Sequence, residues 1–292
     1  MHTRAIRRGG QSGWAHDEGH RAGAFHTYDR FDLGYLGPRK VHVFVPREYE
    51  RPLASVYLND GNTGFWPGGV ANATWDVAGT LSALHGRVEP MIVVALHPVQ
   101  RDREYTHVDW RNGREPWGDL PQYATWLAER VKPWIDANYP TDPDRATVAG
   151  SSHGGLASFW AATRHPRAFR AAGCLSPSFF SGLDDLGTGR VGPVALVDAP
   201  LVADVLATLR DPALRPRLWI CWGTRRDGGH HNAIVEALAA RRGREMADLL
   251  RADFGYRDGR DLWVTEDEGA GHDEHAWRRR FGAFALALFP AH

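Results

Sequence analysis

Apolar strand-like runs alternate with helix-like segments along most of this chain, from about residue 53 to residue 289. The run PMIVVALHP at 90–98 is continuous and apolar, which is typical of a strand buried on both faces of a parallel sheet. The segment at 122–140 places its apolar residues at helical spacing, with a kink expected at Pro133. The alternation therefore predicts an α/β fold, with a mostly parallel central sheet of about eight strands and helices on both faces.

The alternation carries no sign of a second domain. Neither a linker composition nor an internal repeat interrupts it, so we expect residues 25–292 to form a single domain. Residues 1–24 are rich in Gly, Arg and His without periodicity, which predicts a loose N-terminal tail. Basic residues in that tail are not followed by an apolar run, so it does not resemble a secretory signal.

The charge balance and the cysteines indicate which kinds of partner and which cellular compartment to expect. The 35 Lys and Arg residues are matched by 35 Asp and Glu residues, so no basic surface for nucleic acid or an anionic membrane is expected. No stretch approaches the roughly 20 apolar residues that span a bilayer. Cys174 and Cys221 lie in apolar runs and are expected to be buried reduced thiols. A cytoplasmic location is the resulting expectation.

A Gly-x-Ser-x-Gly string stands at the end of a predicted strand. Residues 145–160 read RATVAGSSHGGLASFW, an apolar run, two serines between glycines, and then a helix-like segment. This order is the context of a nucleophile elbow, the sharp turn that presents the serine of an α/β-hydrolase. The register from Gly150 to Gly154 puts Ser152 at the apex and Ser151 in the variable position. Glycine on both sides relieves crowding where the turn folds back.

A serine hydroxyl is a weak nucleophile unless a base removes its proton, so an acid and a histidine should follow. In this fold the chain order is Ser, then Asp or Glu, then His, each in a loop after a strand. Asp227 comes after the strand-like run RLWICWGT, and His272 comes after DLWVTEDEGAG. The sequence therefore predicts a triad of Ser152, His272 and Asp227, with Asp198 as the next loop acid to consider.

Acyl transfer also needs two N–H donors that stabilise the oxyanion. His153 follows the predicted nucleophile and should give one donor from its backbone at the start of the helix. The second is expected near Gly61 and Asn62, after the strand-like run ASVYLND. A plain turn is the alternative interpretation of Asp60, Gly61 and Asn62.

Six segments carry a family resemblance over about residues 30–290: VYLNDG, REY, PWIDANY, AGSSHGGLAS, LSPSF and GHDEHAW. With them the chain resembles the putative-esterase family of α/β-hydrolases, which includes esterase D, feruloyl esterases, enterochelin esterases and mycolyltransferases. The resemblance implies Ser152 as nucleophile and His272 as base. Members often have the acid just after a Gly-Thr strand end, and here Asp227 arrives one residue late. His153 replaces the commoner Met, which should matter little because its backbone N–H is the donor.

Two alternatives to a serine enzyme remain. A metal site would draw on side chains near two predicted strand ends: Asp227, His230, His231, His272, Asp273, Glu274 and His275. None shows an HExxH helix or a paired-cysteine spacing, so no metal is expected, and a solvated loop is the simpler interpretation of the adjacent histidines. An idle binding domain of the same fold is the second alternative, which a complete triad argues against.

Aromatic residues gather in two loops that follow predicted strands and should overhang Ser152. They are Phe65, Trp66, Trp75, Trp110 and Trp117. Because ligand pockets are lined mainly by apolar and aromatic groups, we expect Trp66 or Trp110 at the mouth and a substrate with an aromatic or sugar-like face. Anchoring of the loops is the alternative. Gly61, Arg103 and Glu104 are further candidates for the lining, although the last two are also expected to suit a structural ion pair.

The combined expectation is a serine esterase that needs no cofactor. Ser152 would attack the ester carbon while His272 removes its proton, and Asp227 would hold the imidazole in the useful tautomer. The expected partner is a small-molecule ester, with neither nucleic acid nor membrane involved. An acyltransferase that passes the acyl group to an alcohol or sugar is the alternative.

Overall fold

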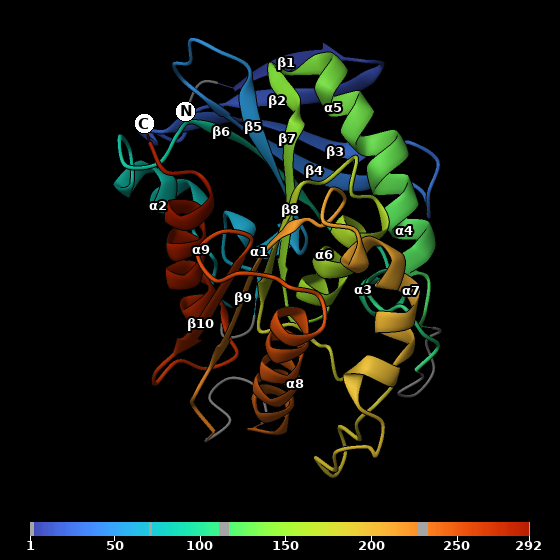
Figure 1. Cartoon of the computed structure of the whole chain (residues 1–292). Helices are drawn as coiled ribbons and strands as arrows, with labels where there is room; N and C mark the ends of the chain where they lie inside the picture. Colours follow the sequence, from blue (N-terminus) through green and yellow to red (C-terminus); the bar gives the residue numbers. More distant parts are fainter. Residues whose placement is uncertain (1–2, 70–71, 111–116, 227–232, 292) are drawn as a thin grey trace.

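The computed structural model describes residues 3–69, 72–110, 117–226 and 233–291, in which the strands form a mixed sheet (Figure 1). The strand order is β1-β2-β3-β4-β6-β5-β7-β8-β9-β10. Neighbours from β1 to β6 pair antiparallel, and neighbours from β6 to β10 pair parallel. The strands are β1 (Thr3–Arg8), β2 (Gln11–His16), β3 (Gly23–Phe31), β4 (Arg39–Pro46), β5 (Leu53–Leu58), β6 (Met91–Leu96), β7 (Thr141–Ser151), β8 (Ala171–Leu175), β9 (Arg217–Gly223) and β10 (Leu262–Asp267).

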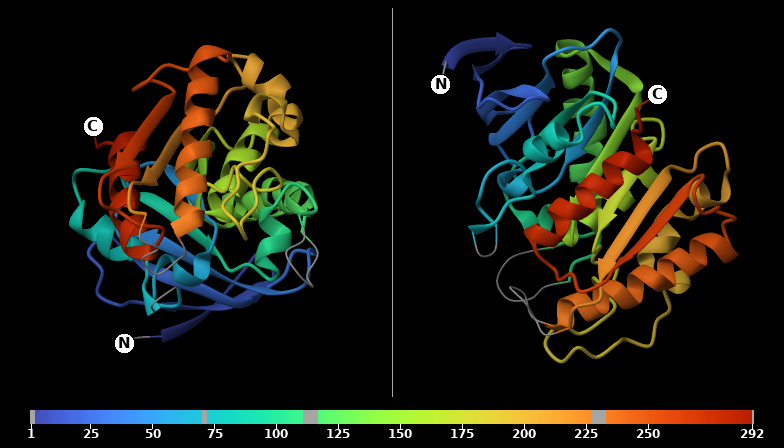
Figure 2. Two further views of the ribbon diagram at one scale, coloured as in Figure 1. Left: turned by 90° about the horizontal axis from the view of Figure 1, so that it is seen from below. Right: turned by 90° about the vertical axis from the view of Figure 1, so that its left-hand side faces the viewer.

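Helices cover both faces of this sheet (Figure 2). Their bounds are α1 (Gly61–Gly64), α2 (Val77–Ala83), α3 (Arg101–Tyr105), α4 (Leu120–Trp126), α5 (Lys132–Asn138), α6 (His153–Arg164), α7 (Pro200–Arg210), α8 (Ala233–Ala252) and α9 (Glu274–Leu288), with a 3-10 turn at Leu196–Asp198. The face covered by α4 to α8 forms one core, and α2 and α9 close the other. Within the described parts of the chain, no helix is long and apolar enough to cross a membrane.

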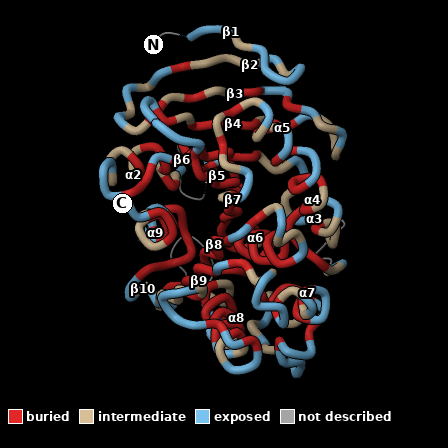
Figure 3. Tube along the Cα trace, turned by 45° about the horizontal axis from the view of Figure 1, so that its top comes forward, coloured by how far each residue is buried: buried red, intermediate tan, exposed pale blue. Residues whose placement is uncertain are grey.

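The strands between these layers alternate their side chains between the two cores. On β7, Val148 packs into the α4–α8 core and Ala149 into the α2–α9 core, and on β9 Ile220 and Cys221 divide in the same way. Both faces of the central strands are therefore buried, as Figure 3 shows by their colour. Continuous apolar runs are the expected sequence pattern of such strands, and the predicted α/β fold with a mostly parallel sheet is confirmed.

The start of the chain corrects the prediction of a loose tail over residues 1–24. Residues 3–16 form the β1–β2 hairpin, whose second strand pairs with β3 and extends the sheet to ten strands among the described residues. Most side chains of β1 are exposed, so backbone pairing holds this edge rather than apolar burial. Because these strands have no fully buried face, their sequence lacks the alternation of apolar and polar residues that predicts a strand. The hairpin was therefore not expected from the sequence.

The predicted helix at 122–140 is interrupted where Pro133 was expected to disturb it. A π-helical turn at Leu127–Val131 separates α4 from α5. Proline has no N–H and cannot donate to the carbonyl one turn before it, so regular α-helical bonding is broken there. The break lets both short helices keep their apolar sides on the sheet, with Leu127 and Ile135 fully buried.

The parallel strands bring their carboxyl ends to one edge of the sheet. The turn after β5 carries Asp60, the turn after β7 carries Ser152, and the turn after β8 carries Ser176. His272 follows β10 at the same edge. Chemistry in open α/β sheets collects at such an edge.

A chain of hydrogen bonds, buried at one end and partly buried at the other, links histidines across the antiparallel part of the sheet. Thr27 Oγ1 lies 2.8 Å from His42 Nδ1, and His42 Nε2 lies 3.1 Å from His97 Nε2. Burial, followed by the charge of neighbouring His97, lowers the pKa of His42 to about 3. Burial, followed by the charge of Lys40, lowers the pKa of His97 to about 4. Both rings are therefore neutral near pH 7, where one nitrogen can donate and its neighbour accept.

These lowered pKa values predict a loss of stability in weak acid. Between pH 7 and pH 5 the unfolded chain binds protons at His42 and His97 while the folded chain does not, so the free energy of unfolding falls as the pH falls. Each histidine contributes at most about 1.4 kcal/mol per pH unit. Urea unfolding at several pH values should show a shallower dependence in His42→Gln than in the wild type. The exposed His85→Gln serves as control, and equal slopes in His42→Gln and wild type would contradict the assignment.

Candidate active site

The turn between β7 and α6 presents Ser152 in a strained backbone conformation. Its φ is 53° and its ψ is −121°, a region that residues other than glycine rarely adopt. The Ser152 N–H donates to the carbonyl of Leu175 at 2.8 Å, and the Ser178 N–H donates to the carbonyl of Ser152 at 3.0 Å. The end of β8 thus holds the turn from both sides.

The two glycines around Ser152 are required by close packing. A Cβ on Gly150 would lie 2.5 Å from the carbonyl oxygen of Gly154, and a Cβ on Gly154 would lie 2.9 Å from a carboxylate oxygen of Asp60. The first of these contacts is with backbone, which cannot rotate away. The Gly-x-Ser-x-Gly spacing therefore lets strand and helix meet tightly while the serine stands at the apex, as predicted for an elbow.

His272 is buried in the loop between β10 and α9 and contacts a carboxylate. Its Nδ1 lies 2.6 Å from Oε2 of Glu236, with both side chains almost fully buried. The other carboxylate oxygen of Glu236 accepts a hydrogen bond from the Gly223 N–H at the end of β9. With Glu236 ionised, Nδ1 donates to it and leaves Nε2 as the acceptor of the ring.

Glu236 comes from the first turn of helix α8, and sequence reasoning did not select it. The acid is expected in a loop after a strand, whereas this carboxylate lies in a helix. A usable signal existed, because Glu236 shares the spacing of the buried residues Ala239, Ala240 and Gly243. A carboxylate on the buried side of a helix is unusual unless it is paired.

The predicted acid Asp227 lies outside the described residues, as do His230 and His231. The structure therefore places none of these three relative to His272. Asp198, the other loop acid considered, is exposed in the 3-10 turn at Leu196–Asp198. Asp273 caps α9 by accepting from the Ala276 N–H at 2.9 Å. No cluster of three metal-ligating side chains occurs within the described ranges.

Ser152 opens into a cavity of about 430 Å³. The lining comprises Asp60, Asn62, Thr63, Gly68, Gly69, Arg101, Ser151, Ser152, Glu274 and Trp277. Arg101 donates to both carboxylate oxygens of Asp60, at 2.6 and 2.8 Å, so this part of the wall is an ion pair. Glu274 and Trp277 belong to α9, which begins two residues after His272, so the cavity lies between the turn of Ser152 and this helix.

The two predicted oxyanion donors come from different elements, and one of them lines this cavity. Asn62 belongs to the short helix α1 and lines the cavity, while His153 begins helix α6 directly after Ser152. Gly61 has no room for a side chain, because a Cβ there would lie 2.5 Å from the backbone of Ala95 and Leu96. Burial, followed by the charges of Arg101 and His272, lowers the pKa of the His153 side chain to about 3, so this ring is neutral near pH 7.

A second serine lies beside the predicted nucleophile. The Oγ atoms of Ser152 and Ser178 are 3.2 Å apart, and Ser178 is completely buried. Ser178 belongs to the LSPSF segment, which contributed to the family resemblance without a role of its own. The hydroxyl of Ser178 is therefore placed to share a hydrogen bond with that of Ser152.

Comparison with known proteins assigns the family. The model of the family described as Putative esterase matches residues 36–288. The chain belongs to this family. A search of curated protein sequences finds no match.

Solved structures with the same fold include several esterases and related proteins. The BES protein from Bacillus cereus superposes with a TM-score of 0.66 at 15% identity, over 91% of this chain and 94% of that one. The siderophore hydrolase EstA from Aspergillus nidulans gives 0.66 at 17% identity, over 89% and 94%. The enterobactin esterase FES from Shigella flexneri gives 0.60 at 18% identity, over 90% of this chain but 58% of that one. At such identities these matches establish the fold alone.

Two predicted lining residues of this esterase-family chain contact other groups. Glu104 is completely buried and lies 2.6 Å from Arg39, and it also accepts from the N–H groups of Val99 and Gln100. Arg103 donates to Asp119 at 3.1 Å. Neither residue is among those that line the cavity at Ser152, where Arg101 is found instead.

The two predicted tryptophans occupy different surroundings. Trp66 donates to Glu18 at 2.9 Å and packs on the rings of Phe25 and His42, so it contacts the antiparallel strands. Trp110 packs on Trp117 with ring centroids 5.1 Å apart, and Trp117 packs on the His153 ring at 5.4 Å. The ring of Trp117 therefore lies between Trp110 and His153, the residue that follows the predicted nucleophile.

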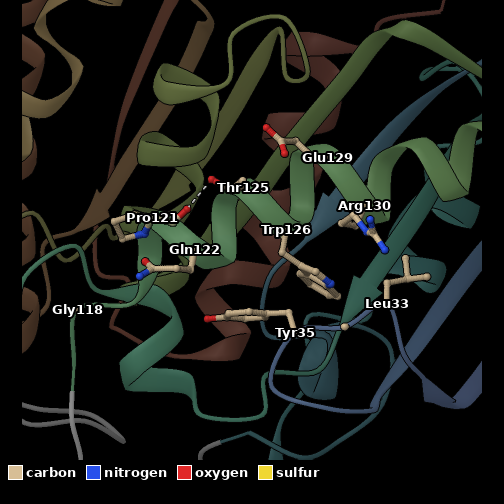
Figure 4. Close-up of a pocket in the computed structure, with 10 residues that line it drawn as sticks. Leu33, Tyr35, Gly118, Pro121, Gln122, Thr125, Trp126, Glu129 and Arg130 are labelled. Carbon is tan, nitrogen blue, oxygen red and sulfur yellow. Dashed lines mark hydrogen bonds between the residues drawn. The ribbon is translucent and has the colours of Figure 1, made fainter.

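A larger cavity of about 790 Å³ lies away from Ser152, between α4 and the turn that joins β3 to β4 (Figure 4). Tyr35 and Trp126 lie in its wall with ring centroids 5.5 Å apart. Trp126 packs on the guanidinium of Arg39 at 4.3 Å, and Tyr35 donates to Asp119. Its described lining residues include the hydroxyl groups of Tyr35 and Thr125, and none of them is a serine, cysteine or histidine.

The burial of Glu104 predicts a stability role rather than substrate contact. Glu104→Gln leaves Arg39 buried without its counter-charge, which should lower the free energy of unfolding by about 3–5 kcal/mol. Chemical denaturation measures this loss, and the exposed neighbour Asp102→Asn is the control. KM for an ester should stay the same at temperatures where both variants are folded. A raised KM with unchanged stability would instead place Glu104 at the substrate.

Proposed function

We propose that this protein is a serine hydrolase that cleaves a carboxylic ester through an acyl-enzyme, with Ser152 as nucleophile, His272 as base and Glu236 as acid. The observation that carries the proposal is the 2.6 Å contact between Glu236 and His272 at the edge where the strained turn presents Ser152. Membership of the esterase family supports the same chemistry. Asp227, expected from the sequence, is the alternative acid.

The first half of the proposed reaction forms the acyl-enzyme. Ser152 Oγ attacks the ester carbon as His272 Nε2 takes its proton, and the Glu236 carboxylate stabilises the resulting imidazolium through Nδ1–H. The tetrahedral oxyanion accepts from the backbone N–H groups of His153 and the Asn62 region. Its collapse breaks the bond to the leaving alcohol, which receives the proton from His272.

The second half returns the enzyme to its starting state. Water loses a proton to His272 and attacks the acyl carbon. The second tetrahedral intermediate then releases the carboxylic acid, and Ser152 Oγ regains its proton. Every proton in this cycle passes through His272, and no cofactor is part of the proposal.

The substrate class is proposed as a small ester with an aromatic or sugar-like part. The cavity at Ser152 is modest in size, and the rings of Trp110 and Trp117 lie next to His153. Two structural neighbours are described as a siderophore hydrolase and an enterobactin esterase, the latter in the presence of 2,3-dihydroxy-N-benzoylglycine. A soluble setting such as the cytoplasm suits a substrate of this kind.

An acyltransferase remains the second candidate, because the same acyl-enzyme can react with an alcohol in place of water. Product analysis with an aromatic ester, in water and with a competing alcohol, separates the two activities. A binding module of the same fold would give neither product.

Substitution of the two adjacent serines tests the nucleophile. Ser152→Ala should lower kcat on an activated ester by up to about 10⁶-fold, as when a whole triad fails. Ser151→Ala should cost far less, because its hydroxyl is not at the apex of the turn. Steady-state kinetics and labelling by a fluorophosphonate measure both. If Ser151→Ala is the inactive variant and Ser152→Ala remains active, the proposed register is wrong.

A matched pair of substitutions tests the acid. Glu236→Gln keeps the size of the side chain but removes the charge that holds the imidazole, so kcat should fall by up to about 10⁴-fold. Asp227→Asn should have a small effect if Glu236 is the acid. Circular dichroism confirms that each variant is folded. The reverse pattern, with Asp227→Asn inactive and Glu236→Gln active, would restore the acid expected from the sequence.

A further inference from the structure

We propose that Arg280 is a positioning residue, which holds His272 and Glu236 in the geometry that the reaction needs. The inference rests on the proposed function and adds a residue that neither the sequence motifs nor the triad includes. Arg280 lies on the inner side of α9, two turns after His272, and is almost completely buried.

Each hydrogen bond of this guanidinium leads to a group beside the catalytic pair. Nη2 donates to the carbonyl of Gly271 at 3.3 Å, and Gly271 directly precedes His272. Nε donates to Asp267 at 3.0 Å, at the end of β10, where the loop that carries His272 begins. Arg280 therefore contacts the loop that carries His272 at two points, where the loop begins and directly before His272.

The third contact leads to the acid. Nη1 donates to Ser176 Oγ at 2.7 Å, and this hydroxyl lies 3.5 Å from Oε1 of Glu236. Because Ser176 Oγ accepts from Arg280, its own proton is available to point at the Glu236 carboxylate. Ser176 is completely buried, and its hydroxyl is oriented by these contacts with Arg280 and Glu236.

The space for this guanidinium is made by the end of β9. A Cβ on Gly223 would lie 2.7 Å from Arg280 Nη2 and 2.1 Å from the carbonyl oxygen of Ala270. The same Gly223 donates its N–H to Glu236. Gly223 therefore donates to Glu236 and also leaves room for the guanidinium. Arg280 accordingly lies against the strand end that contacts the proposed acid.

Burial of an arginine is costly unless its donors and its charge are satisfied. A general stabilising role would be served as well by an apolar side chain. A planar fork, in contrast, reaches a loop carbonyl, a serine and a carboxylate from three separate nitrogens, whereas the donors of a lysine all leave from one nitrogen. The geometry therefore points to orientation of the base and the acid as the function of Arg280.

The test compares Arg280→Met with Arg279→Met. Arg279 is the adjacent residue, contacts the same Asp267 at 3.4 Å, and is more than half exposed. In Arg280→Met we expect kcat to fall about tenfold to a hundredfold with KM little changed, because the catalytic groups are misaligned while the cavity is intact. Arg279→Met should match the wild type in both constants.

A spectroscopic readout separates positioning from general stability. The proton between His272 Nδ1 and Glu236 should give a low-field NMR resonance, which we expect to broaden or vanish in Arg280→Met and to persist in Arg279→Met. Arg280→Lys keeps the charge but not the fork, and it should recover only part of kcat. A folded Arg280→Met with the resonance and kcat of the wild type would overturn the inference.

A second variant, Ser176→Ala, tests the same chain of contacts. If Arg280→Met does not fold, Ser176→Ala removes the link to Glu236 with a smaller change of volume, and it should lower kcat with KM retained. Full activity of a folded Ser176→Ala together with full activity of Arg280→Lys would also overturn the inference. Failure of the proposed function has a different signature, since Ser152→Ala would then keep the activity of the wild type.

Discussion

The candidate site depends on a pair of backbone hydrogen bonds between the turn after β7 and the end of β8. The N–H of Ser152 donates to Leu175, and the N–H of Ser178 donates back to the carbonyl of Ser152. Together they maintain a backbone conformation at Ser152 that its own side chain disfavours. Because β7 and β8 are neighbours with both faces buried, the position of Ser152 is tied to the packing of the whole sheet.

Several buried ionisable side chains around this frame contact a partner. Glu236 contacts His272, Arg39 contacts Glu104, and Asp184 contacts Arg242 at 2.6 Å. Replacing such a pair by apolar residues often costs little, whereas removing one partner leaves the other buried and unsatisfied and costs much. Of these three, the Glu236–His272 pair is the one to which we assign a role in the proposed reaction.

The proposed acid keeps the order along the chain that is typical of this fold, but it comes from a helix and not from a loop. Ser152, Glu236 and His272 follow one another along the chain in the order that α/β-hydrolases use. Glu236 nevertheless comes from the first turn of a helix, whereas the sequence pointed to Asp227, nine residues earlier. A helix holds a carboxylate more rigidly than a loop, and the buried side of α8 brings Glu236 to the N–H of Gly223 and to His272.

The sequence by itself determined the layered α/β fold, the turn at Ser152 and the placement of His272 after the last strand. These features depend on residues close together in the chain, since apolar periodicity and a five-residue motif are local patterns. The β1–β2 hairpin escaped this reasoning because its strands lack a fully buried face. Only the tertiary structure paired His272 with Glu236, Ser152 with Ser178, and Arg280 with Ser176, which are 36, 26 and 104 residues apart. No local pattern encodes such contacts, because they arise where strand ends meet at one edge of the sheet.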